Sequence, residues 1–196
     1  MDFNGIAGFL WSVADLLRGD YKQSDYGKVI LPFTLLRRMD CVLAATKADV
    51  LDEYKKRQHL NVPLHDFLTR KSNQSFYNTS ELDMPRLLAD SNNIKPNLIS
   101  YVAAFSANVR DIFDRYEFTS QIERLDNANL LYQVAQRFAN VNLHPDAVDN
   151  ATMVDIFTWI REMVDNDLVF NVGRNPSGAD HFFALASGDA AFTIGT

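Results

Sequence analysis

Two short clusters of basic residues carry the most recognisable chemistry in this 196-residue sequence. Both clusters lie in the N-terminal third, and their members are Arg37, Arg38, Lys55, Lys56 and Arg57. Cationic side chains of this kind contact nucleic-acid phosphates without reading the base sequence. We therefore predict these five residues as contacts to the DNA backbone.

The charge balance limits how strong such binding can be. The chain has 19 basic and 25 acidic side chains, a formal net charge of −6, which argues against an autonomous, strongly basic nucleic-acid binder. Residues 1–71 hold 11 basic and 9 acidic side chains, whereas residues 72–196 hold 8 and 16, so a polyanion should prefer the N-terminal third. The alternative is that the clusters are solvated helix faces, with Arg37 and Arg38 paired to Asp40 and its neighbours.

The sequence contains no motif for catalysis, cofactor binding or metal binding, and we predict none of these sites in the chain. Gly27-Lys28 is followed by Val29, so it does not match a phosphate-binding loop. The histidines are scattered rather than paired at metal-ligand spacing, at positions His59, His65, His144 and His181. Cys41 is the only cysteine, which excludes an internal disulfide and a thiolate metal cluster.

A second candidate surface is a contact to another protein through Trp11 and Arg18. The apolar stripe of the first predicted helix is formed by Ile6, Phe9, Leu10, Val13, Leu16 and Leu17. Trp11 and Arg18 point off this stripe, and such residues are frequent in protein interfaces. The alternatives are that a second helix of the same domain covers Trp11, and that Arg18 interacts with its own helix C-terminus.

Apolar residues recur at helical spacing along most of the chain. The candidate contact residues named above must therefore be positioned by helices. We predict a mainly α, bundle-like domain of about seven helices in residues 1–168. The helices are expected near residues 5–18, 26–43 with Ser24 as N-cap, 49–58, 83–88, 96–116, 120–138 and 150–164. Residues 169–196 are rich in turn-forming residues and are predicted to be a poorly structured tail or the start of another domain.

Several local features refine this prediction. Pro32 should kink or split its helix, because it removes a backbone N–H and clashes with the preceding turn. Ser80 and Asp83 resemble a capping box. Residues 61–80 are expected to be an irregular, mobile connection, and residues 96–116 one continuous helix with an unbroken apolar seam.

The longest nearly apolar run, residues 29–36, is much shorter than the roughly 20 residues a membrane helix needs. The N-terminus lacks the pattern of a signal peptide. We therefore expect a cytoplasmic protein with no membrane partner.

A set of short motifs occurs in a fixed order along the chain. The first are Leu10-Trp11, Ala14-Asp15-Leu16-Leu17-Arg18-Gly19, Tyr26, Val29-Ile30-Leu31-Pro32 and Leu35-Leu36-Arg37-Arg38-Met39-Asp40. They are followed by Tyr101, Phe105-Ser106, Val109, Ile112-Phe113, Phe138, Val141-Asn142-Leu143-His144-Pro145, Val148, Asn150, Met153 and Ile156-Phe157, and the set spans about residues 9–160. In these motifs the chain resembles the N-terminal helical domain of the modification (M) subunit of type I restriction-modification enzymes.

The resemblance implies a function in a methyltransferase assembly. In that family the helical domain precedes an α/β domain that methylates adenine N6 with S-adenosylmethionine. The implied partners are a specificity (S) subunit, a second M subunit and a restriction (R) subunit that can join them, with DNA bound through the assembly. S-adenosylmethionine is implied for the full-length family, and no cofactor is predicted in this chain.

The chain departs from the family pattern beyond about residue 165. The family's Asn-Pro-Pro-aromatic motif is not found, since Asn175-Pro176 is followed by Ser177-Gly178. The residues after Gly178 lack the family's Thr-Pro-Arg stretch. We predict a helical assembly and DNA-embracing domain that does not methylate DNA alone. The alternative is a truncated, free-standing helical adaptor or regulator that binds the specificity subunit without catalysis.

Overall fold

A computed structural model describes residues 3–22 and 24–165, with side chains described up to residue 160. These residues form ten α-helices and one short 3-10 helix and contain no strand, which confirms the mainly α prediction. The helices are α1 (Phe3–Leu17), α2 (Tyr26–Leu43), α3 (Lys47–Arg57), α4 (His65–Ser72), α5 (Met84–Ala89), η1 (Ser91–Asn93), α6 (Ile94–Ala103), α7 (Ala107–Arg115), α8 (Phe118–Asn127), α9 (Leu131–Asn140) and α10 (Asn150–Asp165). The predicted tail, residues 169–196, lies outside the described residues.

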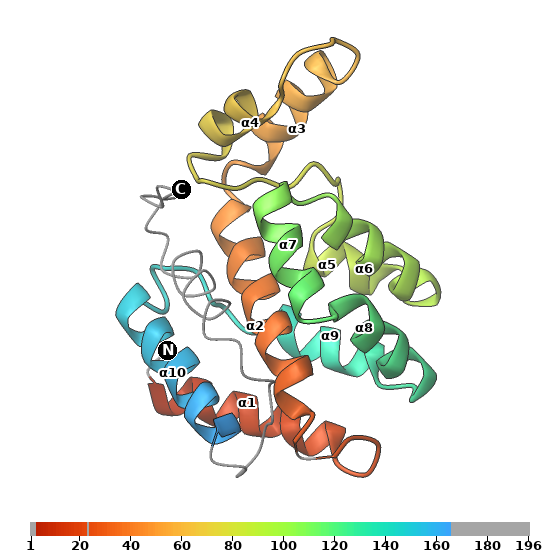
Figure 1. Cartoon of the computed structure of the whole chain (residues 1–196), viewed down its shortest axis with the longest axis vertical. Coiled ribbons are helices and arrows are strands. Elements are labelled where there is room, and N and C mark those ends of the chain that lie inside the picture. Colours follow the sequence, from red (N-terminus) through yellow and green to blue (C-terminus); the bar gives the residue numbers. More distant parts are fainter. Residues whose placement is uncertain (1–2, 23, 166–196) are drawn as a thin grey trace.

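Helix α2 runs through the middle of the molecule and packs against α1, α8, α9 and α10 (Figure 1). It is buried on nearly every side, including Val29, Phe33 and Leu36, which are 0% exposed. Of the two effects predicted for Pro32, a kink or a split of this helix, the split is wrong, because α2 is one helix from Tyr26 to Leu43. Burial of several large side chains, each stabilising by about 1.5–3 kcal/mol, outweighs the roughly 3 kcal/mol cost of an interior proline.

A chain of aromatic rings joins α2 to its neighbours. Phe33 of α2 lies edge-on to Phe118 of α8 at 5.0 Å and stacks on Phe138 of α9 at 5.3 Å between ring centroids. Phe113 of α7 stacks on Phe118 at 5.2 Å, and Phe9 of α1 meets Phe138 edge-on at 5.2 Å. These rings connect α1, α2, α7, α8 and α9 into one core.

The predicted continuous helix over residues 96–116 is wrong, because the chain forms α6 and α7 with a break between them. Residues 77–79 lie beside the break: the N–H of Thr79 donates to the carbonyl of Ala104, and the N–H of Ser106 donates to that of Tyr77, both at 3.0 Å. The side-chain amide of Asn78 donates to the carbonyl of Tyr101 at 2.9 Å. These bonds satisfy backbone groups that a continuous helix would pair internally.

The predicted helix over residues 120–138 is also two helices, α8 and α9. Between them Asn129 takes the left-handed conformation, with a φ of 58°, and the N–H of Leu130 donates to the carbonyl of Leu125 at 2.9 Å. This backbone arrangement ends a helix, and asparagine tolerates it better than most residues do.

Two capping predictions need correction. Asp83 is itself the N-cap of α5, and its carboxylate accepts from the N–H of Arg86 at 2.9 Å, so Ser80 does not cap that helix. The N-cap of α2 is Asp25 rather than Ser24, and it makes no capping bond through its side chain.

The expected irregular connection at residues 61–80 contains a helix, α4, which pairs with α3. Together they form a helical hairpin that projects from one end of the molecule, while α1 and α10 lie side by side near the other end (Figure 1). Leu68 and Val50 are each 1% exposed within this hairpin. Among the described residues, no helix is long and apolar enough to cross a membrane.

Candidate functional site

Arg38 lies inside the protein, where its guanidinium holds a distant segment of the chain. It is 1% exposed, and its Nη1 donates to the carbonyls of Leu143 and Val148, the latter at 2.7 Å. Its Nη2 donates to Oδ1 of Asn150, the first residue of α10, at 2.6 Å. The prediction of Arg38 as a DNA contact is wrong, because its donors face carbonyl and amide oxygens of the protein itself.

Arg37, the preceding residue of α2, binds the same part of the chain as Arg38 does. Its Nε donates to the carbonyl of Val141 at 2.8 Å, and its Nη1 forms an ion pair with Asp40 at 2.7 Å. The Arg37 side chain is only 14% exposed. The structure therefore shows the pairing with Asp40 that was the alternative to a DNA contact at Arg37. The two arginines attach α2 to residues 141–150.

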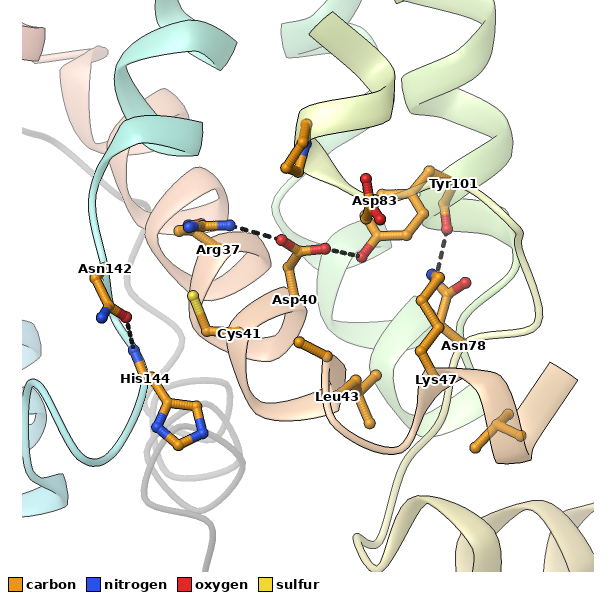
Figure 2. A pocket seen from close by; sticks show the side chains of 13 residues that line it. Arg37, Asp40, Cys41, Leu43, Lys47, Asn78, Asp83, Tyr101, Asn142 and His144 are labelled. Carbon is orange, nitrogen blue, oxygen red and sulfur yellow. Dashed lines mark hydrogen bonds and ion pairs between the residues drawn. The ribbon is translucent and has the colours of Figure 1, made fainter. Parts of the chain in front are cut away.

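Asp40 is the centre of a buried polar network (Figure 2). Its Oδ1 accepts from the hydroxyl of Tyr101 at 2.8 Å, and its Oδ2 faces Arg37. Burial, together with the adjacent Asp40 carboxylate, raises the pKa of Tyr101 well above its usual value, so the phenol stays protonated and donates. The network joins α2 to α6.

Lys47, at the start of α3, approaches this network from the other side. Its ammonium donates to the carbonyl of Leu82 and lies 5.3 Å from the centroid of the Tyr101 ring. Burial lowers the pKa of Lys47. The lysine thus connects the α3–α4 hairpin to α6 and to the segment before α5.

A cavity of about 320 Å³ lies among these residues (Figure 2). It is bordered by the end of α2, the start of α3, residues 78–85, Tyr101 and residues 142–144. Its walls combine polar and apolar side chains, which are Arg37, Asp40, Cys41, Leu43, Ala44, Lys47, Val50, Asn78, Asp83, Pro85, Tyr101, Asn142 and His144. In the described part of the chain, no group of three or more histidines, cysteines and carboxylates could hold a metal ion.

The second basic cluster lies on the α3–α4 hairpin, and two of its three members are paired within the protein. Lys55 pairs with Glu81 at 2.6 Å, and Arg57 pairs with Glu53 and lies 3.8 Å from the Phe67 ring centroid. Lys56 is exposed. Since Arg38 is buried and Arg37 is bound to Val141, the predicted five residues do not form one basic patch.

Trp11 lies on an exposed part of the surface between α1 and α10. Its side chain is 45% exposed and meets Trp159 of α10 edge-on at 6.3 Å, while Trp159 meets Phe3 edge-on at 5.9 Å. We call these three residues the aromatic face. Arg18 is also exposed and pairs with Asp15 at 2.7 Å. Within the described residues no second helix buries Trp11, and its role as a partner contact stays a prediction.

Sequence reasoning did not single out Lys47, Tyr101 or Trp159 as parts of a site. Lys47 and Tyr101 lie in separate helices, and only the tertiary fold brings the Lys47 ammonium beside the Tyr101 ring. Trp159 could have been noticed as the second tryptophan, but its position beside Trp11 depends on how α10 docks against α1.

The chain matches the family model described as the HsdM N-terminal domain over residues 6–138. The chain belongs to this family. It therefore contains the N-terminal domain of a type I restriction-modification M subunit. No curated protein and no solved structure matches the chain. The matched region of this HsdM N-terminal domain runs from α1 into α9, so Arg37 and Arg38 lie inside it and the residues they hold, 141–150, lie just beyond it.

Proposed function

We propose that this HsdM N-terminal domain is an assembly module, which binds the specificity subunit of a type I modification methyltransferase and does not itself catalyse methylation. Support comes from family membership together with the architecture of the described residues. Two of their buried charged groups fasten separate segments together: Arg38 holds the residues before α10 against α2, and Asp40 joins α2 to α6. In such an assembly, chemistry would belong to another domain and DNA would be contacted jointly by several subunits.

The observation that carries this proposal is the aromatic face on α1 and α10. Exposed tryptophan is uncommon on a monomeric surface and is enriched among residues that dominate binding energy. Trp11 has almost half of its surface available, and the neighbouring Trp159 supports its ring from one side. A helix of the specificity subunit that packs over this face would bury both aromatic rings.

The test is to capture the M subunit with its specificity subunit after a Trp11→Ala substitution. We expect capture to be lost while folding stability falls by only about 1 kcal/mol, because an edge-on aromatic contact at a half-exposed site contributes about that much. A melting curve measured beside the capture separates these effects. A large loss of stability would instead show that Trp11 is part of the core.

Tyr132→Ala provides the matched control, since Tyr132 is another partly exposed aromatic residue, 36% exposed, on α9. This variant should bind the specificity subunit as the parent does. If the Trp11→Ala variant is captured as well as the Tyr132→Ala variant, the aromatic face is not the assembly surface.

A further inference from the structure

The cavity beside Asp40 has the size of a small-molecule site and a lining drawn from distant parts of the chain. Its volume of about 320 Å³ lies within the range of pockets that hold small organic ligands. Lys47 from α3 and Asn142 from the segment held by Arg37 both reach it. A molecule bound there would therefore contact the hairpin, α2, residues 78–85 and residues 142–144 together.

The carboxylate and amide oxygens of this lining are already occupied by donors of the protein. The two oxygens of Asp40 accept from Tyr101 and Arg37. The other side-chain oxygens accept from backbone N–H groups, at Asp83 from Arg86, at Asn78 from Ser80, and at Asn142 from His144. A ligand that needed acceptors would have to compete with these bonds.

The lining has spare donors instead. Lys47 carries three N–H groups and uses one, on the carbonyl of Leu82, and it forms no ion pair within the described residues. Arg37 uses Nε and Nη1, which leaves Nη2 available. The side-chain amide nitrogen of Asn142 also lacks a protein partner in this part of the chain. The unused hydrogen-bonding capacity therefore suits a ligand that supplies oxygen acceptors.

The charged and apolar groups that line the cavity favour an acidic ligand with an apolar part. The Asp40 carboxylate is held between Arg37 and Tyr101. Lys47 is a partly desolvated cation: the carboxylates of Asp40 and Asp83 act on it through space, but it forms no ion pair with either within the described residues. A ligand anion beside Lys47 would offset that desolvation. Leu43 and Val50 supply hydrocarbon surface to the same space.

We propose that this cavity binds a small organic carboxylate. Its oxygens accept hydrogen bonds from Lys47 and Arg37, and its apolar part contacts Leu43 and Val50. The proposal does not depend on the assembly function, because it concerns a cavity among α2, α3 and α6 rather than the aromatic face on α1 and α10.

Benzoate titrated into the full 196-residue chain tests the proposal, with backbone amide NMR shifts as the measurement. We expect saturable shifts at residues that line the cavity, including Leu43, Ala44 and Val50. Benzamide has nearly the same shape without the negative charge and should bind about tenfold more weakly, since its neutral oxygen forms no ion pair with Lys47 or Arg37. Equal affinity for the two probes, or no saturable shift at these residues, would overturn the proposal.

Two variants locate the site. Lys47→Met should weaken benzoate binding about tenfold, whereas Lys56→Met, an exposed lysine on the same helix, should leave it unchanged. Ala44→Trp places a ring at an exposed position of the lining and should block benzoate while leaving both cations in place. Binding that survives both Lys47→Met and Ala44→Trp would show that benzoate binds elsewhere.

Discussion

Arg38 shows how one side chain can organise a contact between distant segments. Its guanidinium is buried without a carboxylate in contact, and it satisfies the carbonyls of Leu143 and Val148 and the amide oxygen of Asn150. Burying a cation is costly, so its pKa is lowered by desolvation. The three hydrogen bonds offset this desolvation cost, because the planar guanidinium reaches three acceptors at once.

We therefore expect Arg38→Met to lower the free energy of unfolding by roughly 3 kcal/mol or more, because it leaves several buried oxygens without donors. Arg38→Lys should recover only part of this loss, since a single ammonium cannot reproduce the guanidinium geometry. Arg115→Met, at an exposed arginine of α7, should change stability by less than about 0.5 kcal/mol. Chemical denaturation measures all three, and equal stability of Arg38→Met and Arg115→Met would contradict the role assigned to Arg38.

At the scale of elements, the α3–α4 hairpin is the part that projects furthest from the helices packed around α2 (Figure 1). Lys47 and Lys55 anchor it, through Leu82 and Glu81 of the segment that follows. Leu60 and Val62 lie at the turn of the hairpin and are 53% and 39% exposed. Such a projecting element can reach a neighbouring molecule that the body of the domain does not touch.

The proposal that this hairpin contacts DNA now depends mainly on Lys56, because Lys55 and Arg57 are paired internally. We expect Lys56→Glu to weaken DNA retention by the complete assembly and to reduce the salt slope by about 0.9 for one lost phosphate contact. Lys22→Glu, at an exposed lysine between α1 and α2, is the control for net charge. If both variants retain DNA equally, the hairpin is not a DNA contact.

At the scale of the whole molecule, the packing of the described residues joins helices that are far apart in the sequence. The aromatic rings around Phe33 connect five helices, and the Arg37–Arg38 pair fastens residues 141–150 to α2. This organisation supports the proposed role as an assembly module.

We accordingly expect no saturable binding of S-adenosylmethionine to residues 1–196 tighter than about millimolar, measured by calorimetric titration. The physical reason is that the sequence offers neither a glycine-rich cofactor loop nor an Asn-Pro-Pro-aromatic motif. An M subunit that retains an active methyltransferase domain serves as the positive control. Saturable micromolar binding to this chain would show that a cofactor site exists outside the expected motifs.

The sequence by itself determined the helical class, the positions of α1, α2 and α10, and the family. Each depends on local information, since apolar residues three and four positions apart define a helix face without reference to the rest of the chain. The family resemblance likewise rests on motifs read in order, and the match over residues 6–138 confirms it.

Only the tertiary structure decided where Arg38 points, where the helix of residues 96–116 breaks, and what lies beside Trp11. The acceptors of Arg38 are 105 to 112 positions away along the chain, and residues 77–79 meet the break after Ala103 from a separate segment. Trp159 reaches Trp11 only because α10 packs on α1. Adjacent arginines have the same local pattern on a solvated helix face as in a core, and the distant oxygen atoms that fold against them decide which of the two applies.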